Sequence, residues 1–272
     1  MERIALDAQT SAQTRPASRG DVGIDTVTTA AVRGCDNRAM NPANAHPGAL
    51  IVIEGIDGSG STTQSEMLLG WLRRVGIPGT PTCEPSKGPI GRTLRLHLGK
   101  HLELGGPQAE ALAFAADRMD HVTSEIEPAL ARGITVVSDR YYLSSLAYQA
   151  LGCDLAWLRE INRFALRPDM TVFLSVPVDV GVARFSGRAT RERFEEDRDE
   201  LARIAGMYEA AIAALKADGE EVQVIDGTRS PAEVHADIVR LAAVVLRPRY
   251  PGVSLDGDAP EQSAVGSTAP TD

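Results

Sequence analysis

A buried strand that runs directly into a glycine-rich turn and then into a helix is the feature that most limits the possible folds of this chain. Residues 49–54 read ALIVIE, and a turn with three glycines follows at residues 55–60. Residues 55–62 match the phosphate-loop template GxxxxGK[ST] at every fixed position except the lysine, where the chain has Ser61. Such a loop turns backbone N–H groups inward, and the positive end of the helix after it points to the same place.

The missing lysine changes the chemistry of this loop and leaves its backbone pattern intact. A phosphate-loop lysine bridges the outer phosphates of a nucleotide, and removal of one preorganised donor of this kind costs about 3 kcal/mol, or roughly a hundredfold in rate. Thr62 occupies the position where a hydroxyl ligates Mg²⁺. A glycine-rich turn that only closes a tight strand–helix connection would show the same pattern, so the loop alone leaves both interpretations open.

Short apolar runs alternate with longer stretches of helical period through the middle of the chain. Buried strands are predicted at residues 49–53, 134–138, 171–176 and 221–225, with a weaker one at 80–83. Helical patterns occur at residues 61–75, 108–132, 154–165, 179–186, 194–216 and 231–246. This alternation predicts an α/β fold, a parallel sheet with helices on both faces. Ligands bind such sheets at the carboxyl ends of the strands.

The two ends of the chain differ in composition from this middle part. Residues 1–48 contain no aromatic residue, and residues 248–272 contain only Tyr250 and are rich in Pro, Gly, Ser and acid. Sequences of this kind bury too little apolar surface to offset the entropy lost on folding. We therefore expect one domain at residues 49–247, between a disordered N-terminal arm and a disordered acidic C-terminal tail.

The remaining composition narrows the class of protein. A formal net charge of −9 argues against a protein that binds nucleic acid or a membrane surface. No run of roughly 18 apolar residues predicts a membrane span, and the three cysteines form no metal-binding pattern. Residues 1–48 contain neither a secretory h-region nor the acid-poor composition of a transit peptide. We expect a cytoplasmic protein with reduced thiols.

A second segment suited to phosphate binding follows the strand predicted at residues 134–138. It reads DRYYLSSLAYQ and begins with Asp139 and Arg140. A carboxylate at the end of such a strand can hold Mg²⁺ directly or through water, and the arginine adds positive charge beside it. An Asp–Arg pair on the surface is the simpler interpretation, but two phosphate-handling elements on separate strands favour a site.

Six sequence blocks resemble the thymidylate kinase family in order and spacing. They read IEGIDGSG.TTQ at residues 53–64, EP.....G..LR at 84–95, FAADR at 114–118, DRYYLSSLAYQ at 139–149, RPD.T..L at 167–174 and R..R.RFE at 188–195. The resemblance implies a P-loop nucleoside monophosphate kinase fold with a five-stranded parallel sheet and a short Arg-rich lid. It also implies transfer of a phosphoryl group from ATP to dTMP with Mg²⁺, giving dTDP for dTTP biosynthesis.

The resemblance implies which residues would form the two halves of an active site. The ATP-binding residues would be Gly55, Ile56, Asp57, Gly58, Ser59, Gly60, Ser61, Thr62 and Thr63, with Thr62 and Asp139 at the metal. The dTMP-binding residues would be Glu84, Arg95, Phe114, Arg118, Arg140, Ser145, Tyr148 and Gln149.

The resemblance implies specific roles for five members of the dTMP-binding set. Arg95 and Arg140 would hold the phosphate, because planar guanidinium groups grip two oxygens at once. Phe114 would stack on thymine, Arg118 would reach a thymine carbonyl, and Tyr148 would crowd the 2′ side of the sugar. Without the resemblance, an aromatic residue in LAFAADR would be read as core, and an arginine on an amphipathic helix as a solvated charge.

Catalysis would depend on Asp57, on Arg140 and on the lid. In family members whose phosphate loop lacks an arginine, as here, the lid supplies a catalytic arginine. Arg188 and Arg191 are our candidates, with Arg193 as a third. The absence of the loop lysine leaves three explanations open. A lid arginine replaces it, Lys87 or Arg92 reaches in from the acceptor loop at residues 84–95, or the protein binds nucleotide without turnover.

The intact dTMP-binding blocks favour an active kinase. The alternatives are a nucleotide-binding pseudokinase with a regulatory role, suggested by Ser61, and a kinase for another deoxynucleoside monophosphate. A second departure from the family is Ser175, where aspartate is common. Because members of the family commonly form homodimers, we expect a homodimer as well.

Overall fold

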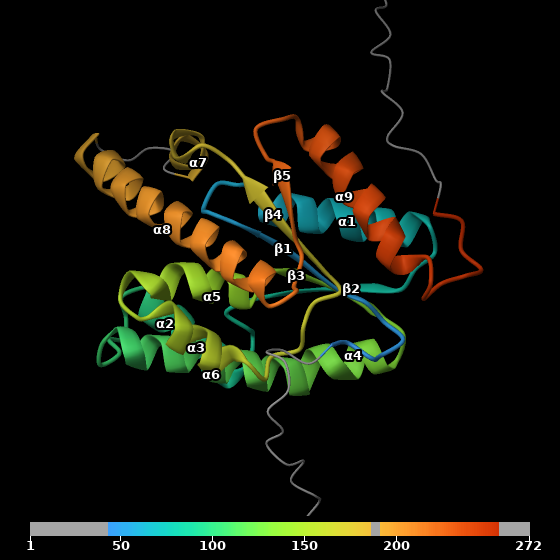
Figure 1. The fold of residues 1–272 in the computed structure, drawn as a ribbon, viewed down its shortest axis with the longest axis horizontal. Helices are drawn as coiled ribbons and strands as arrows, with labels where there is room; N and C mark the ends of the chain where they lie inside the picture. The colour runs from blue at the N-terminus through green and yellow to red at the C-terminus, as the bar shows by residue number, and fades with distance from the viewer. Residues whose placement is uncertain (1–42, 186–190, 256–272) are drawn as a thin grey trace, which may run out of the picture. The chain divides into compact units, whose positions relative to one another are not determined.

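The computed structural model describes residues 43–185 and 191–255. Its centre is one parallel sheet with the strand order β2-β3-β1-β4-β5 (Figure 1). The strands are β1 (Leu50–Gly55), β2 (Gly79–Cys83), β3 (Thr135–Asp139), β4 (Met170–Ser175) and β5 (Val222–Asp226). The prediction of a five-stranded parallel sheet is confirmed, and each strand begins and ends within two residues of its predicted range.

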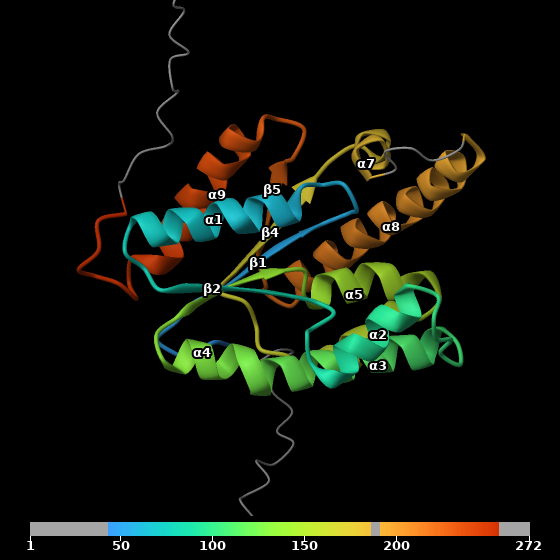
Figure 2. The same ribbon diagram turned by 180° about the vertical axis from the view of Figure 1, so that it is seen from behind.

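Helices cover both faces of this sheet (Figure 2). One face carries α1 (Ser61–Arg74) and α9 (Pro231–Leu246). The other carries α3 (Pro107–His121), α4 (Glu127–Ala131), α5 (Tyr142–Tyr148), α6 (Leu155–Asn162) and α8 (Arg191–Ala217). In addition, α2 (Pro89–Leu98) packs on α3, and α7 (Val178–Phe185) packs on α8.

Alternation along β1 divides the core into two layers. Ile51 and Ile53 belong to the cluster under α1 and α9, whereas Leu50 and Val52 belong to the cluster under α3, α5 and α8. All four side chains are completely buried, as expected of a central parallel strand. The next even-numbered residue is Glu54, so the strand places a carboxylate on the same side as α5 and α8.

The prediction of one continuous α-helix at residues 108–132 is wrong. The chain forms α3, then a π-helical turn at Val122–Ile126, then α4. Pro128 gives the physical reason, because a proline ring clashes with the carbonyl four residues earlier in a regular α-helix, here that of Ser124. Two further helices, α2 and α5, were absent from the predicted set, and the seven residues of α5 are too few to show a clear period.

The predicted domain limits are too narrow on both sides. Tyr250 donates a hydrogen bond to the Gly133 carbonyl at 2.7 Å, and Leu255 is buried against the α1 and α9 layer. At the other end, Asn44 Nδ2 lies 2.6 Å from Asp169 Oδ2. The prediction of a disordered tail is therefore wrong for residues 248–255, which pack on the domain through Tyr250, Val253 and Leu255.

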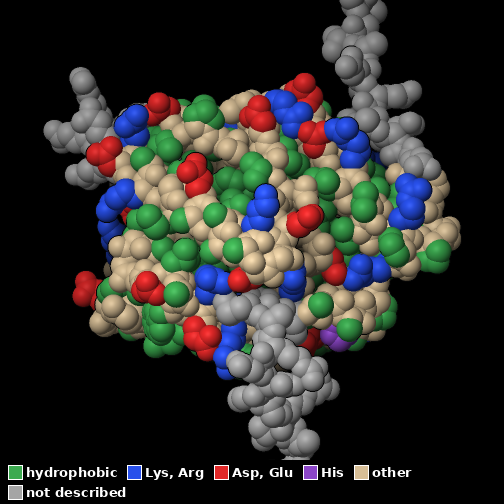
Figure 3. Space-filling model, viewed as in Figure 1, with side chains coloured by type: hydrophobic (Ala, Val, Ile, Leu, Met, Phe, Trp, Pro, Cys, Tyr) green, Lys and Arg blue, Asp and Glu red, His purple; other side chains and the backbone are tan. Residues whose placement is uncertain are grey.

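Charged side chains of both signs are distributed over the surface of the domain (Figure 3). Basic and acidic side chains are interspersed on the face seen in Figure 3, with hydrophobic side chains between them. No helix among the described residues is both long enough and apolar enough to cross a membrane.

Candidate active site at the carboxyl end of the sheet

The loop between β1 and α1 has the backbone of an anion cradle. Gly58 and Gly60 have φ values of 80° and 97°, a region that side chains other than glycine rarely adopt. A Cβ on Gly58 would also lie 2.2 Å from the Gly181 carbonyl oxygen, because the loop packs directly on α7. Gly60 is the N-cap of α1 and offers no side-chain acceptor, so N–H groups of the first turn are left for a ligand.

Thr62 and Asp139, the two predicted metal ligands, lie in direct contact beside this loop. The Thr62 hydroxyl donates to Asp139 Oδ2 at 2.5 Å. The other carboxylate oxygen, Oδ1, is buried and has no hydrogen-bond partner among the described residues. A hydroxyl and an incompletely satisfied carboxylate are ligands that suit Mg²⁺, so the two residues fit a metal site.

Arg140 follows Asp139 and adopts an unusual backbone conformation. Its φ is 72°, in the left-handed region that is costly for a residue with a Cβ. The guanidinium pairs with Asp57 of the phosphate loop and lies over the Tyr148 ring, 5.1 Å from its centroid. Burial raises the pKa of Tyr148 to about 12, so this ring carries a neutral hydroxyl at physiological pH. The arginine thereby connects the phosphate loop to α5.

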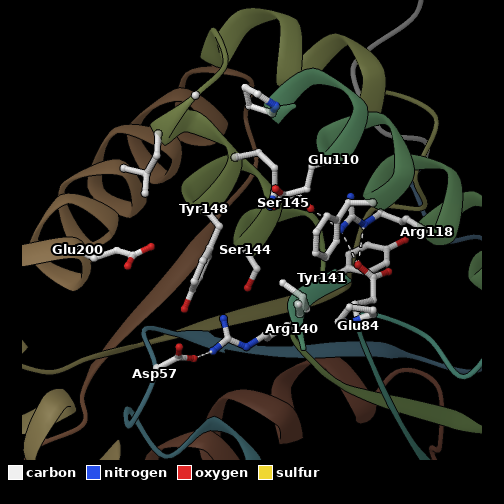
Figure 4. Close-up of a pocket in the computed structure, with 17 residues that line it drawn as sticks. Asp57, Glu84, Glu110, Arg118, Arg140, Tyr141, Ser144, Ser145, Tyr148 and Glu200 are labelled. Carbon is white, nitrogen blue, oxygen red and sulfur yellow. Dashed lines mark hydrogen bonds and ion pairs between the residues drawn. The ribbon is translucent and has the colours of Figure 1, made fainter. Parts of the chain in front are cut away.

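A cavity of about 730 Å³ opens next to this arginine. Figure 4 shows Asp57 and Arg140 joined at one end, with Glu84, Arg118 and Tyr141 grouped at the other. The lining includes nearly all of the predicted dTMP-binding residues: Glu84, Phe114, Arg118, Arg140, Ser145, Tyr148 and Gln149. Residues from the end of β2 and from α3 and α5 are thus brought to one hollow beside the phosphate loop.

Arg118 is fixed inside this cavity wall by a buried polar network. Its Nε and Nη2 donate to Glu84 Oε2 at 2.9 and 2.5 Å, and Nη2 also donates to Ser145 Oγ at 2.8 Å. Nη1 donates to Asn162 Oδ1. Only 1% of the Arg118 side chain and 4% of the Glu84 side chain are exposed. Four hydrogen bonds therefore orient one guanidinium, which has five N–H groups in total.

The same network extends to residues that the sequence analysis did not single out. His121 Nδ1 lies 3.3 Å from Glu84 Oε1, and its Nε2 lies 2.6 Å from Thr82 Oγ1. Asp117 accepts hydrogen bonds from the Ser86 backbone N–H and hydroxyl at 2.7 and 2.6 Å. Together with Arg118, these residues of α3 hold the acceptor loop that follows β2. Their signal in the sequence is the helical spacing of the polar positions in ADRMDH.

Some residues that the sequence analysis assigned to the site neither line the cavity nor contact the phosphate loop. Arg95 Nη2 donates to the Pro85 carbonyl and is not among the cavity-lining residues. Arg92 Nη1 donates to the Lys87 carbonyl at 2.8 Å, within the acceptor loop itself. Arg188 lies outside the described residues, and the side chains of Arg191 and Arg193 at the start of α8 lie outside them too.

Arg184, at the end of α7, contacts the phosphate loop from its other side. Its Nη1 lies 3.5 Å from the Gly58 carbonyl and 3.2 Å from the Gly227 carbonyl. A second cavity, of about 220 Å³, is lined there by Gly60, Arg184 and Arg229, among others. The loop thus has a large hollow on the acceptor side and a smaller one on the side of α9.

Glu54 is the most deeply buried carboxylate near the site, and burial raises its pKa from 4.5 to about 7. Between those values the folded protein keeps a proton that the unfolded chain releases, so stability falls as pH rises through this window, by about 3 kcal/mol in total. We expect wild type to lose this stability relative to Glu54→Gln between pH 4.5 and 8, measured by urea unfolding. If the free energies of unfolding of the two proteins change in parallel with pH, this prediction is contradicted.

The parallel sheet, the glycine loop and the Thr62–Asp139 pair together define a P-loop nucleotide-binding protein. The thymidylate kinase family model matches residues 53–238. A probable thymidylate kinase of Thermococcus gammatolerans is 40% identical over 202 residues, covering 71% of this chain and 95% of that protein. A thymidylate kinase of Thermomicrobium roseum is 44% identical over 200 residues, covering 70% and 91%. The chain therefore belongs to the thymidylate kinase family.

Proposed function

We propose that this protein transfers the γ-phosphoryl group of ATP to dTMP, giving dTDP for dTTP biosynthesis. The observation that carries the proposal is the position of Arg140, which links the phosphate loop to a cavity large enough for a nucleotide. Two polyanions that react with each other need positive charge between them. Arg140 lies where the donor and the acceptor phosphates would meet.

The acceptor cavity suits a pyrimidine with carbonyl acceptors and an N–H donor. Arg118 has one N–H group beyond the four bonds described, and this group would donate to a carbonyl such as O4 of thymine. Gln149 Oε1 is buried without a hydrogen-bond partner among the described residues, and it would accept the N3–H. Phe114 and Tyr148 both line the cavity, where Phe114 would stack on the base and Tyr148 would lie beside the sugar.

On the donor side, the loop at residues 55–63 would hold the phosphates of ATP, and the smaller cavity beside Arg184 would take the rest of the nucleotide. Thr62 and Asp139 would hold Mg²⁺. Bound there, Mg²⁺ neutralises charge on the donor phosphates.

We also propose a cytoplasmic homodimer. Leu96 and Leu112 are half exposed on α2 and α3, as expected of helices that bury apolar surface against a second copy.

The reaction needs positioning more than acid–base chemistry. An oxygen of the dTMP phosphate forms a bond to the γ-phosphorus, the bond from that phosphorus to the β–γ bridging oxygen breaks, and ADP leaves with the electron pair. Because the acceptor is already an anion, no strong general base is required. Asp57 would instead orient Arg140 between the two phosphates. Arg188 or Arg191 of the lid would add further charge.

The test is turnover of dTMP by the full chain with ATP and Mg²⁺, followed as dTDP by chromatography. We expect dTMP-dependent formation of dTDP and ADP in equal amounts. Competing dUMP and dGMP at equal concentration should be phosphorylated more slowly. Binding of dTMP without phosphoryl transfer at high enzyme concentration would overturn the proposal and favour the pseudokinase. Faster turnover of another monophosphate would change the assigned substrate.

Ser61→Lys tests how completely other residues replace the missing lysine. We expect kcat to rise about tenfold, less than the roughly hundredfold that one lost donor is worth, because Arg140 and Arg184 already bring charge to the loop. Ser61→Met matches the length of lysine without its charge and should not raise kcat. Activity found only in the lysine variant would support the pseudokinase, and an unchanged kcat would mean full replacement by another cation.

A further inference from the structure

Glu54 is a buried carboxylate to which the proposed phosphoryl transfer gives no role. It is the fifth residue of β1, directly before the phosphate loop, and its side chain is completely inaccessible. A carboxylate in such a place is costly unless hydrogen bonds compensate for the lost water. The partners of Glu54 therefore indicate what it does.

Those partners lie at the beginning of α5. Glu54 Oε1 accepts hydrogen bonds from the backbone N–H groups of Tyr141 at 2.8 Å and Ser144 at 3.3 Å. Oε2 accepts from the Ser144 hydroxyl at 2.5 Å. The helix has no side-chain cap of its own and no acidic residue in its first turn. Glu54 supplies from β1 the side-chain acceptor that a capping residue would normally provide.

The residue directly before these bonded positions is Arg140, which precedes the helix. Its own N–H donates to the Ile53 carbonyl at 3.0 Å, and its carbonyl accepts from the Ser138 hydroxyl at 2.7 Å. The next N–H along the chain, that of Tyr141, is the one bound by Glu54. Two consecutive residues of β1 thus fix the peptide groups on both sides of a residue whose φ is 72°. A left-handed arginine persists only where its surroundings enforce it.

A second contact connects the same carboxylate to the phosphate loop. Tyr208 of α8 places its hydroxyl 2.9 Å from Ser144 Oγ and 3.2 Å from the Gly55 carbonyl. Tyr208 Oη also lies 3.4 Å from Glu54 Oε2. The carboxylate therefore lies at a junction of β1, α5 and α8, between the first glycine of the loop and the arginine at the acceptor cavity.

We propose that Glu54 is a positioning residue that holds the Arg140 backbone in its left-handed conformation, so that the guanidinium points at the acceptor phosphate. The inference rests on the proposed function, in which Arg140 binds the phosphate of dTMP. It predicts that the effect of Glu54 on dTMP passes through Arg140. Binding of ATP to the loop amides depends on it much less, because Glu54 reaches Gly55 through the longer contact with Tyr208.

A double-mutant cycle tests this route. Glu54→Gln is made in wild type and in Arg140→Ala, and the dissociation constants of dTMP and ATP are measured by calorimetry, with kcat and KM where turnover permits. We expect about tenfold weaker dTMP binding in the wild-type background and less than about twofold in the Arg140→Ala background. The dissociation constant of ATP should change less than about twofold in both. Equal losses in both backgrounds, or an equal loss for ATP, would overturn the proposal.

Glu220→Gln is the matched control. Glu220 is also a buried carboxylate with a raised pKa, caused mainly by burial, and it also contacts the start of α5. It accepts from the Tyr142 hydroxyl and not from the helix backbone. We expect this variant to lower thermal stability and leave the dTMP dissociation constant unchanged. A loss of dTMP affinity equal to that of Glu54→Gln would reduce Glu54 to a merely structural role.

A second variant covers the case in which Glu54→Gln does not fold. Ser144→Ala removes the 2.5 Å hydrogen bond to Oε2 and keeps the carboxylate, and it should weaken dTMP binding about threefold through the same cycle. An unchanged dTMP affinity would contradict the proposal. If wild type itself fails to bind dTMP, the proposed function and this inference fall together. If wild type binds dTMP and the cycle shows no coupling, only this inference fails.

Discussion

Replacement of Arg140 by alanine will lower kcat/KM for dTMP about a thousandfold, the upper range for loss of one preorganised charged donor. The residue pairs with Asp57 of the loop and lies over Tyr148 at the cavity, so its side chain touches both halves of the site. Its loss removes charge-assisted hydrogen bonds that strengthen as charge develops between donor and acceptor. The measurement is steady-state turnover with dTMP varied at saturating ATP.

Two further variants define what the loss means. Arg140→Lys keeps the charge without the planar pair of donors, and it should recover no more than about a tenth of the lost activity. Arg163→Ala removes an arginine whose ion pair with Glu160 is exposed and which does not line the cavity, so kcat/KM should stay within about twofold of wild type. If Arg140→Ala is inactive because it does not fold, or if Arg140→Lys restores full activity, the assigned role of Arg140 is contradicted.

The parts of the molecule that the sequence predicted well are those with local signals. The run ALIVIE is apolar on both faces, which is typical of a central parallel strand, and the glycines after it are required by φ values of 80° and 97°. Thr62 and Asp139 are both assigned to a metal site from the loop template and the end of a strand, and they meet at the carboxyl ends of β1 and β3. Each of these inferences needs only spacing along the chain.

The parts that were missed depend on contacts between distant segments. Glu54 reads as the last letter of a strand, and its role becomes visible only when α5, almost ninety residues later, presents two N–H groups to it. Asn162 and His121 belong to the Arg118 network in the same way. Arg95 shows the opposite case. The family motif assigns Arg95 to the dTMP phosphate, yet its guanidinium, carried on α2, donates to the Pro85 carbonyl of the acceptor loop.

These long-range contacts have a common arrangement. β1 holds the start of α5 through Glu54, and α3 holds the acceptor loop through Asp117 and Arg118. In both cases a charged side chain on a rigid element binds the backbone or a side chain of a segment at the cavity. Such contacts fix a binding site before the ligand arrives, and they make the site sensitive to loss of any single member.

Arg118→Met should therefore destabilise the fold as well as the site. Removal of the guanidinium leaves the Glu84 carboxylate, 4% exposed, without its main cationic partner, and breaking a buried pair in this way costs about 4 kcal/mol. For a domain of this size the melting temperature should fall by about 10 °C. Differential scanning calorimetry measures the change. Arg163→Met, which breaks only an exposed pair, should cost less than about 1 kcal/mol.

The double variant Arg118→Met with Glu84→Gln separates the two effects of the arginine. A neutral amide at position 84 removes the unpaired charge and can still accept a hydrogen bond from His121, so about half of the lost stability should return. Binding of dTMP should not return, because the donor to the thymine carbonyl is still missing. If the double variant is no more stable than Arg118→Met, the cost arises from lost packing and not from the buried carboxylate. If dTMP affinity returns with stability, Arg118 supports the cavity without touching the base.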